Sequence, residues 1–523
     1  MQSVSGAKMP NNGMNLNYKQ LLKWFVLGLI GLVNGYAATL MYMNGEFPFA
    51  MLTVIVTSLG LYFFGSQKTY AHRYIFPGIA GMIIFVLFPL FYTVNLAFTN
   101  YSGKNQLTFE RAQGVFLDRT YRSGDNYPFK LHEADNGYQL SLTVDGEQLV
   151  TPVIALDNDS VINLDLTPGT AQGEALKIKD IIAKKNQLGQ IELMLPNQEE
   201  VRMSGLRNFG AVGPLYTKLD EDGELLKNNR TGEIVKANFE TGFYQQYDES
   251  TQQFVSEEGL APGFIVANGI ANFERIYQDE GIQEPFLEIF IWTIFFAVST
   301  VVLTLIIGLV LACIVQWEAL RGRAVYRVLL ILPYAVPSFI SILVFKGLFN
   351  NSFGEINMIL DAIFGIKPTW FTDPTLARLM VIIVNIWLGF PYMMILAMGL
   401  LKAIPEDLYE ASAIDGANFL QNFKNITLPL IMKPMTPLLI ASFAFNFNNF
   451  VMIYLLTEGG PNMIGVSEPA GYTDLLVSYT YRIAFEGSGT QDFGLASAIA
   501  TLIFLLVGGL ALLNLRFTKL TQD

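Results

Sequence analysis

The stretch Ser442–Phe450, which reads SFAFNFNNF, places three asparagines among phenylalanines in a run that is otherwise apolar enough to lie in a membrane. On a helix with 100° per residue, Asn446 and Asn449 share a face with Phe445. Asn448 lies away from that face. Asparagine offers donors and an acceptor without charge, so these side chains can bind a neutral polar ligand. They can equally hydrogen-bond neighbouring helices, at about 0.6 to 2 kcal/mol each, and the residues alone leave both interpretations open.

Two other apolar runs carry neutral polar and aromatic side chains at helical spacing. One stripe contains Asn385, Leu388, Gly389 and Tyr392; the other contains Tyr334 and Ser338, one turn apart and close to Pro333 and Pro337, which loosen the helix locally. Such stripes suit a carbohydrate, because its hydroxyl groups need donors and acceptors while the apolar faces of its rings pack on aromatic side chains. A glycine such as Gly389 permits close approach of a bulky ligand. A structural role is the alternative, and the residues alone favour it for Tyr334 and Ser338.

These runs indicate an all-α polytopic membrane protein. Of the 523 residues, 52% are hydrophobic and 15% are charged, whereas about a quarter are charged in a typical soluble protein. Eight apolar windows are long enough to cross a hydrocarbon core of about 30 Å as helices: residues 24–43, 46–65, 74–98, 287–316, 326–349, 376–401, 428–457 and 492–516. The first window is followed at once by a second span and lacks a small-residue cleavage site, so we do not expect a signal peptide.

Basic residues in the short connections predict the orientation. They precede the first span, follow the last one, and lie between spans two and three, four and five, and six and seven: Lys8, Lys19, Lys23, Lys68, Arg73, Arg321, Arg323, Arg327, Lys402, Lys424, Arg516 and Lys519. Under the positive-inside rule all of them fall on the cytoplasmic face, together with both termini. We therefore expect a multi-pass protein of the inner (cytoplasmic) membrane, with the segment between spans three and four projecting into the periplasm.

That outward segment, residues 101–285, separates two membrane parts, residues 1–100 and 286–523. It holds 29 acidic and 16 basic residues, a net charge of −13, whereas the rest of the chain has a net charge of +1. Strand–turn–strand patterns predict a β-rich domain; they occur at Tyr138–Val150, Ile191–Leu206 and Asp222–Phe239. We expect a domain that docks a protein partner, and a domain that only protects or stabilises the membrane part is the alternative. Nothing in this charge distribution indicates nucleic acid.

Several function classes are disfavoured by residues that the sequence lacks. No Asp or Glu falls in the central part of the eight windows, although ion-coupled carriers usually need such a relay. The sequence has no Gly-x4-Gly-Lys-Ser/Thr phosphate loop, so we do not expect this chain to bind ATP in that way. One cysteine, Cys313, and two histidines, His72 and His132, argue against a metal site. If the protein pumps, its energy must come from a partner.

A loop between spans six and seven, residues 403–431, is the candidate for that partner. Its first half is predicted to be a short helix, because Pro405 suits a first turn and the acids that follow complement the helix dipole. Gly416 is predicted to end this helix. Composition alone would favour an ordinary connection, since so short a helix does not fold by itself.

The motif in this loop resembles the EAA signature of ATP-binding cassette (ABC) importer permeases. It consists of Glu410, Ala411 and Ser412, then Asp415 and Gly416, and finally Ile426, Leu428 and Pro429. In that family the loop forms a coupling helix seated in a cleft of a cytoplasmic ATPase subunit. The resemblance therefore implies an ATPase-coupling role for Glu410, Ala411, Ser412, Asp415 and Gly416. It also implies a type I permease core and a subunit that is not itself an enzyme.

Further stretches resemble the maltose/maltodextrin permease subunits of this family, including FAFNFNNF, SFGEIN and AGYTDLLVSYTYRIAFEG. The resemblance implies a second homologous permease subunit, a homodimeric ATPase that binds ATP and Mg, and a periplasmic maltose-binding protein. This chain would bind no cofactor, and its other partners would be maltodextrin and membrane lipid. The sugar site that the resemblance implies consists of Tyr334, Ser338, Asn385, Leu388, Gly389, Tyr392, Phe445, Asn446 and Asn449. We expect Asn448, in contrast, to hold helices together.

Three other interpretations remain open at this point. A secondary sugar carrier would need no ATPase, but the EAA-like loop and the missing intramembrane acids argue against it. A membrane sensor would use the outer domain to detect a protein and would not need asparagines in its spans. A polytopic enzyme would need a catalytic group, which we do not see.

Overall fold

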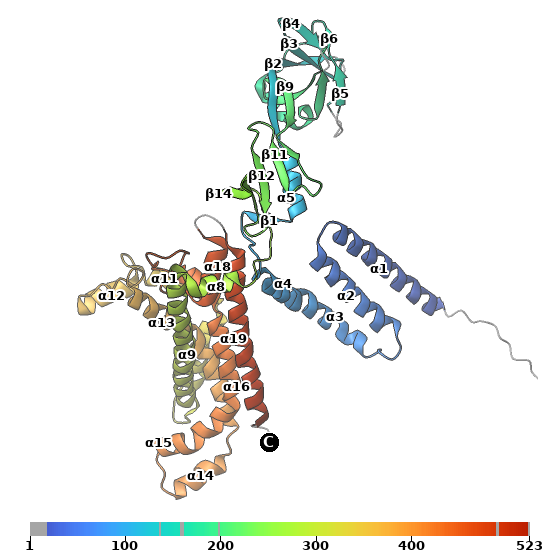
Figure 1. Ribbon diagram of the computed structural model, residues 1–523. Coiled ribbons are helices and arrows are strands. Elements are labelled where there is room, and N and C mark those ends of the chain that lie inside the picture. The colour runs from blue at the N-terminus through green and yellow to red at the C-terminus, as the bar shows by residue number, and fades with distance from the viewer. Residues whose placement is uncertain (1–17, 135–136, 157–161, 197–198, 488–490, 521–523) are drawn as a thin grey trace, which may run out of the picture. The chain divides into compact units, whose positions relative to one another are not determined.

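The computed structural model describes residues 18–134, 137–156, 162–196, 199–487 and 491–520 (Figure 1). The chain divides into two compact units, Lys104–Val266 and a membrane unit of Met1–Gly103 with Ala267–Asp523. The second stretch of the membrane unit begins with α8 (Ala271–Gln278) and the first turns of α9. The interval 101–285 expected from the sequence includes both of these segments.

Seven helices in the described residues are long and apolar enough to cross a membrane, and one bent helix pair makes eight if it counts as a span. The spans are α1 (Tyr18–Met43), α2 (Phe47–Gly65), His72–Leu96, α9 (Glu280–Gln316), α13 (Pro374–Lys402), Phe419–Phe447, α19 (Phe493–Leu520) and the bent pair. The third of these is built from α3 (His72–Met82), a π turn and α4 (Phe88–Leu96). The predicted helical, polytopic fold is confirmed.

The fifth predicted span is not one helix. It consists of α10 (Arg323–Ala335) and α11 (Ser338–Leu348), whose axes differ by 93°. Pro337 has no N–H to continue the ladder, and it forces the preceding residue into an extended conformation with φ −86° and ψ 134°. The prediction that Tyr334 and Ser338 stack one turn apart on one helix is therefore wrong, because the bend lies between them.

The seventh predicted span, 428–457, is also interrupted. The observed helix begins earlier, with α15 (Phe419–Asn422) and a π turn, continues as α16 (Leu428–Phe447), and ends before the separate helix α17 (Phe450–Leu456). Asn449 starts α17, and its side chain accepts a hydrogen bond from the backbone N–H of Met452 at 3.4 Å. Asparagine favours such caps because its side chain competes for backbone groups. The assumption that Phe445, Asn446 and Asn449 lie on one continuous helix is therefore wrong.

The two long helices α9 and α13 form the centre of the membrane unit. A Cβ placed on Gly308 of α9 would lie 2.7 Å from the backbone nitrogen of Met394 in α13, so only glycine allows this approach. Thr293, Thr300 and Thr304 follow one face of α9 and are all buried. Small residues and hydroxyl groups at a helix interface are typical of membrane bundles, where close packing and hydrogen bonds replace the hydrophobic effect.

The insert unit is β-rich, as predicted. Its largest sheet has eight strands in the order β5-β7-β8-β9-β2-β3-β4-β6, a second has five in the order β10 to β14, and β1 pairs with β15. The strands are β1 (Asn105–Leu107), β2 (Thr120–Ala134), β3 (Gly137–Val144), β4 (Glu147–Val150), β5 (Ile162–Asp165), β6 (Thr167–Pro168), β7 (Ile191–Met194), β8 (Glu200–Gly205), β9 (Asn208–Pro214), β10 (Tyr216–Lys218), β11 (Leu225–Asn228), β12 (Ile234–Asn238), β13 (Phe243–Asp248), β14 (Gln253–Leu260) and β15 (Gly263–Phe264). The three predicted strand–turn–strand patterns correspond to the antiparallel pairs β3–β4, β7–β8 and β11–β12.

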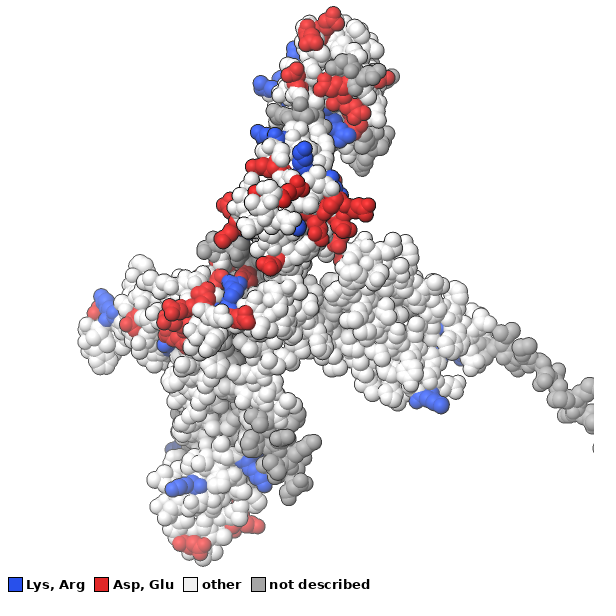
Figure 2. Space-filling model, in the orientation of Figure 1, with Lys and Arg blue, Asp and Glu red and all other residues white. Residues whose placement is uncertain are grey.

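Each large sheet of the insert has its own core. The five-stranded sheet is covered by α5 (Phe109–Leu117), whose Phe116 packs against Tyr216 and Tyr244. The eight-stranded sheet packs with two short helices, α6 (Ile178–Ala183) and α7 (Lys185–Leu188), around buried leucines and isoleucines. Acidic and basic side chains crowd the surface of this unit, whereas most of the helical surface is white in Figure 2.

Candidate functional site

Three of the asparagines predicted for the sugar site form one hydrogen-bonded network. Asn385 of α13 donates to the side-chain oxygen of Asn446 in α16 at 2.7 Å. The amide of Asn449 donates to the side-chain oxygen of Asn385 at 3.3 Å. The structure therefore brings these three residues together from α13, α16 and the start of α17.

The network extends to a residue that the sequence analysis missed. Asn385 also donates to the hydroxyl of Thr300 in α9 at 3.3 Å, and both side chains are buried. Asn446 is buried as well, and its amide donates to the carbonyl of Ser442 one turn earlier at 2.8 Å. These bonds use both N–H groups and the oxygen of Asn385, so the network joins α9, α13, α16 and the start of α17. A row of threonines at helical spacing in α9 was the signal that could have indicated Thr300.

The aromatic residues of the predicted site lie at the surface of this chain. The exposed fraction is 71% for Phe445 and 59% for Tyr334, and Tyr392 is exposed too. Ser338 is also exposed, at the first turn of α11. The predicted set thus divides into a buried amide network and a group of accessible side chains.

Gly389 and Leu388 contribute to helix packing in this chain. A Cβ on Gly389 would lie 3.0 Å from the Cγ2 of Thr304, so this glycine lets α13 approach α9. Leu388 packs against the buried cluster around Trp292 and Phe296.

Asn448 does not join helices within this chain. Its side chain is exposed and donates to the carbonyl of Ala444, four residues earlier on its own helix, at 3.2 Å. The expectation that Asn448 holds helices together is not met here, because this residue comes after the last turn of α16.

The predicted coupling loop contains a short helix, α14 (Glu406–Ile414). Two acids lie in its first turn, where they complement the helix dipole. Gly416 has φ +77°, and the N–H of Ala417 bonds the carbonyl of Ser412 at 2.9 Å, as in a Schellman cap. This confirms the predicted end of the helix, and it leaves Glu410, Ala411 and Asp415 exposed.

The loop is attached to the membrane core on one side and open on the other. The hydroxyl groups of Tyr409 and Thr427 are 2.8 Å apart, which ties α14 to the turn that precedes α16. On the open side, the exposed fraction is 88% for Ile414, and Phe419 and Leu420 are also strongly exposed. Three exposed apolar side chains beside exposed acids are typical of a surface that a protein partner covers.

Comparisons with known proteins agree with this architecture. Residues 304–517 match the family described as binding-protein-dependent transport system inner membrane component, residues 107–269 match the maltose transport system permease protein MalF P2 domain, and residues 21–68 match MalF, N-terminal region, transmembrane helices. The chain is 65% identical to the maltose/maltodextrin transport system permease protein MalF of Vibrio parahaemolyticus and 64% identical to that of Vibrio cholerae, over 100% of both chains in each comparison. It belongs to the MalF family. The identity to the Escherichia coli MalF is 59%, over 96% of this chain and 97% of that protein.

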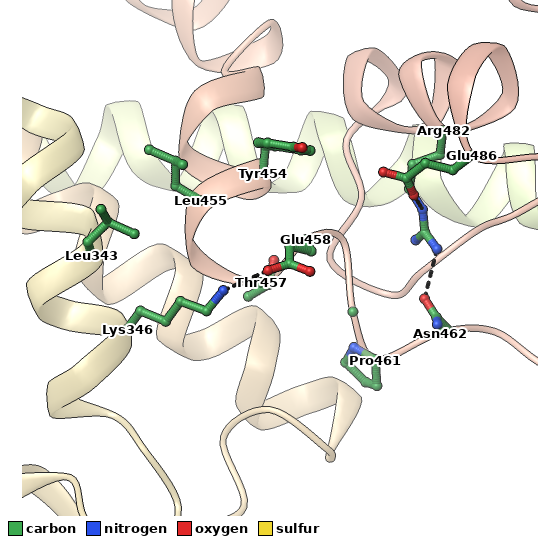
Figure 3. A pocket seen from close by; sticks show the side chains of 11 residues that line it. Leu343, Lys346, Tyr454, Leu455, Thr457, Glu458, Pro461, Asn462, Arg482 and Glu486 are labelled. Carbon is green, nitrogen blue, oxygen red and sulfur yellow. Dashed lines mark hydrogen bonds and ion pairs between the residues drawn. The ribbon is translucent and has the colours of Figure 1, made fainter. Parts of the chain in front are cut away.

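The segment that matches the inner membrane component family also contains a cavity of about 650 Å³ (Figure 3). It lies between α11, α17 and α18 (Leu476–Phe485). Lys346 pairs with Glu458 across it at 2.8 Å, and both side chains are at least partly exposed. Arg482 donates to Asn462 at 2.9 Å and to Glu486 at 3.0 Å on the other side of the cavity. The charged side chains that line the cavity are thus paired with each other in this structure.

A buried carboxylate holds the loop that borders this cavity. Asp474 is completely buried and accepts hydrogen bonds from Arg482 at 2.9 Å, from Ser478 at 2.8 Å and from the backbone of Gly471 at 2.8 Å. Burial raises the pKa of Asp474 to about 6, although Arg482 acts in the opposite direction. This MalF-family segment therefore contains a buried ion pair outside the spans, which hydropathy alone does not reveal.

Proposed function

We propose that this chain is the membrane-spanning subunit of an ATP-driven, binding-protein-dependent importer of maltose and maltodextrins. The observation that carries the proposal is the identity of 59–65% to MalF proteins over essentially the whole length. A secondary carrier is disfavoured by this relationship, because the matched family is described as binding-protein-dependent.

The sugar would pass along the side of the chain where the accessible aromatic side chains adjoin the asparagine network. Phe445 and Tyr334 offer exposed rings for the apolar face of a sugar. The amide of Asn449 makes the longest of the asparagine–asparagine bonds, at 3.3 Å, so a sugar hydroxyl can replace that bond most easily. A site of a few neutral contacts suits transport, since binding must be weak enough for release. Tyr392, Ser338, Leu388 and Gly389 complete the proposed path.

The proposed partners follow from the surfaces of the chain. It has one EAA-like loop, so a second homologous permease subunit would supply the other loop for a homodimeric ATPase that binds ATP and Mg. Ile414, Phe419 and Leu420 would contact the ATPase subunit together with Glu410. A periplasmic maltose-binding protein would dock on the outer face, partly on the insert. In this arrangement both termini and α14 are cytoplasmic, and the unit Lys104–Val266 is periplasmic.

Uptake of labelled maltose by the reconstituted complex tests the proposal directly. We expect uptake only when ATP and the maltose-binding protein are both present. Uptake that persists without ATP and stops with an ionophore would instead indicate a secondary carrier.

Glu410→Lys tests the coupling loop. We expect normal assembly and ATP hydrolysis that is no longer linked to uptake, because the substitution reverses a charge on the exposed face of α14. Glu355→Lys is a matched control, since Glu355 is an exposed acid at the start of α12 (Glu355–Phe364). Parental uptake by a normally assembled Glu410→Lys complex would refute the coupling role.

Asn446→Ala tests the sugar path. We expect slower sugar passage in an assembled complex. If the variant fails to assemble, the asparagines act mainly as contacts between helices.

A further inference from the structure

A groove of about 740 Å³ lies between α1, α2 and α3, apart from the asparagine network. Its walls are apolar along most of its length; they include Val26 and Ile30 of α1, Val56 and Phe64 of α2, and Phe76 of α3. Lys19, Lys23 and Arg73 also line the groove. The groove therefore has apolar walls and a cationic end. An occupant that fits it must have an apolar part for the walls and an anionic group for the cations.

The charges of these first spans are separated along the helices. Lys19 and Lys23 lie in the first turns of α1, and Arg73 lies in the first turn of α3. The one acid in residues 18–96, Glu46, precedes α2 at the opposite end of the α1–α2 hairpin. In Figure 2 the surface of these helices is mostly white, with blue where α2 connects to α3. An anionic group at that end would meet cations without a competing carboxylate.

The basic side chains keep donors for such a group. Lys23 donates to the carbonyl of Gly65 at 3.1 Å, and Arg73 donates to the carbonyls of Phe63 and Ser66 at 3.0 and 2.9 Å. These bonds fix both side chains at the carboxyl end of α2. An ammonium has three N–H groups and a guanidinium has five. Two N–H groups of Lys23 and three of Arg73 therefore remain for a ligand. Lys19 makes no side-chain hydrogen bond or ion pair with another described residue.

The dimensions of the groove suit one lipid leaflet. Lys19 and Asn34 both line it, and the 15 residues between them correspond to about 22 Å of helix. One leaflet with its headgroup region is about 20–22 Å thick, half of a bilayer of about 40–45 Å. The surrounding helices bury almost nothing in the chain, since α1 and α2 bury one alanine each, Ala38 and Ala50. Their surfaces are therefore available to lipid.

We propose that this groove binds an anionic phospholipid, with its phosphate at Lys19, Lys23 and Arg73 and an acyl chain along the apolar walls. Charge complementarity selects this occupant. A free phosphate would gain nothing from the apolar walls, and an apolar helix of another protein would leave the cationic end unsatisfied. The site is independent of the proposed sugar path and needs no sugar or ATP.

Lipid retention by the full-length protein with its partner subunits tests the site. The complex is placed in nanodiscs of phosphatidylcholine with phosphatidylglycerol, extracted in mild detergent, and examined by native mass spectrometry. We expect one retained phosphatidylglycerol, and a loss of about fivefold in retention for each charge removed in Lys19→Gln, Lys23→Gln and Arg73→Gln. Lys68→Gln, which removes a charge from the same end of the spans but does not line the groove, should retain phosphatidylglycerol like the parent.

Three outcomes would overturn the proposal. They are equal retention of phosphatidylcholine and phosphatidylglycerol, unchanged retention by a variant that combines Lys19→Gln, Lys23→Gln and Arg73→Gln, and displacement of the lipid by inorganic phosphate alone. A photoreactive residue in place of Val26 separates lipid from protein as the occupant. Attachment to phospholipid supports the site, and attachment to a polypeptide refutes it.

Discussion

The pair α9–α13 and the helices α1–α3 are all apolar enough to cross a membrane, yet they use their surfaces differently. Fourteen residues of α9 are buried within the chain, whereas α1 buries one and α3 none. The buried face of α9 contains threonines and Gly308, and it faces a buried asparagine in α13. Apolar length therefore identifies a span, while small and neutral polar residues identify the face that packs against protein.

The largest effect expected from this comparison concerns glycine. Gly308→Leu should abolish or strongly reduce assembly, because its Cβ would lie 2.7 Å from the backbone nitrogen of Met394. Overpacking of this kind costs about 1–3 kcal/mol or more. Gly28→Leu in α1 is the matched control, since a Cβ there has no other residue's atom within 4 Å beyond its own helix. Size-exclusion chromatography of fluorescently tagged protein measures assembly; equal yields for both variants would contradict the comparison.

A smaller effect is expected from the buried amides. Asn385→Leu should lower the free energy of unfolding by about 1–2 kcal/mol, because Asn446 and Asn449 lose their partner. Asn95→Leu, at an exposed position of α4, should change it little. Thermal unfolding in detergent with and without maltose compares the two. A variant Asn385→Leu that unfolds like the parent but loses sugar protection would show that Asn385 acts on ligand alone.

A pH dependence of about 1 kcal/mol is expected from Asp474, outside the spans. Its folded-state pKa is raised to about 6 from a usual value near 3.8, so the folded protein binds the proton more tightly than the unfolded chain. The contribution of Asp474 to stability should therefore fall as pH rises from 5 through 6, and level off above pH 7. Asp474→Asn should remove this component in unfolding experiments between pH 5 and 7.5. A parental pH profile in that variant would assign the dependence to other groups.

The smallest effect is expected where a charge pair is exposed. Lys346→Gln breaks the pair with Glu458, which should change stability by no more than about 1 kcal/mol. The same measurement in high salt should reduce the difference between variant and parent. A larger effect would mean that this pair holds α11 in place as firmly as the buried contacts do.

Local chemistry decided which features could be predicted. The turn at Asp145 and Gly146, with φ 49° and 87°, and the helix end at Gly416 follow from the conformations that these residue types favour. Pro337 indicated a weak point in its span, but not a change of direction by 93°. The angle depends on what α10 and α11 pack against, which no local pattern contains.

The asparagine site could be predicted only in part, for a similar reason. The family resemblance implied that Asn385, Asn446 and Asn449 belong to one site, and the structure places them in one network. A helical wheel assumed an unbroken helix, so it could not indicate that Asn449 caps α17. Thr300 and the Asp474–Arg482 pair were missed because their partners come from other elements or from a segment without a clear period.

The attachment of α14 has a mechanical consequence. This short helix is bounded by Pro405, which has no N–H, and by Gly416, which adopts a left-handed conformation. The hydrogen bond between the hydroxyl groups of Tyr409 and Thr427 connects α14 to the turn that precedes α16. Because this bond links the two segments, a displacement of α14 would be passed to α16, the helix that carries Asn446.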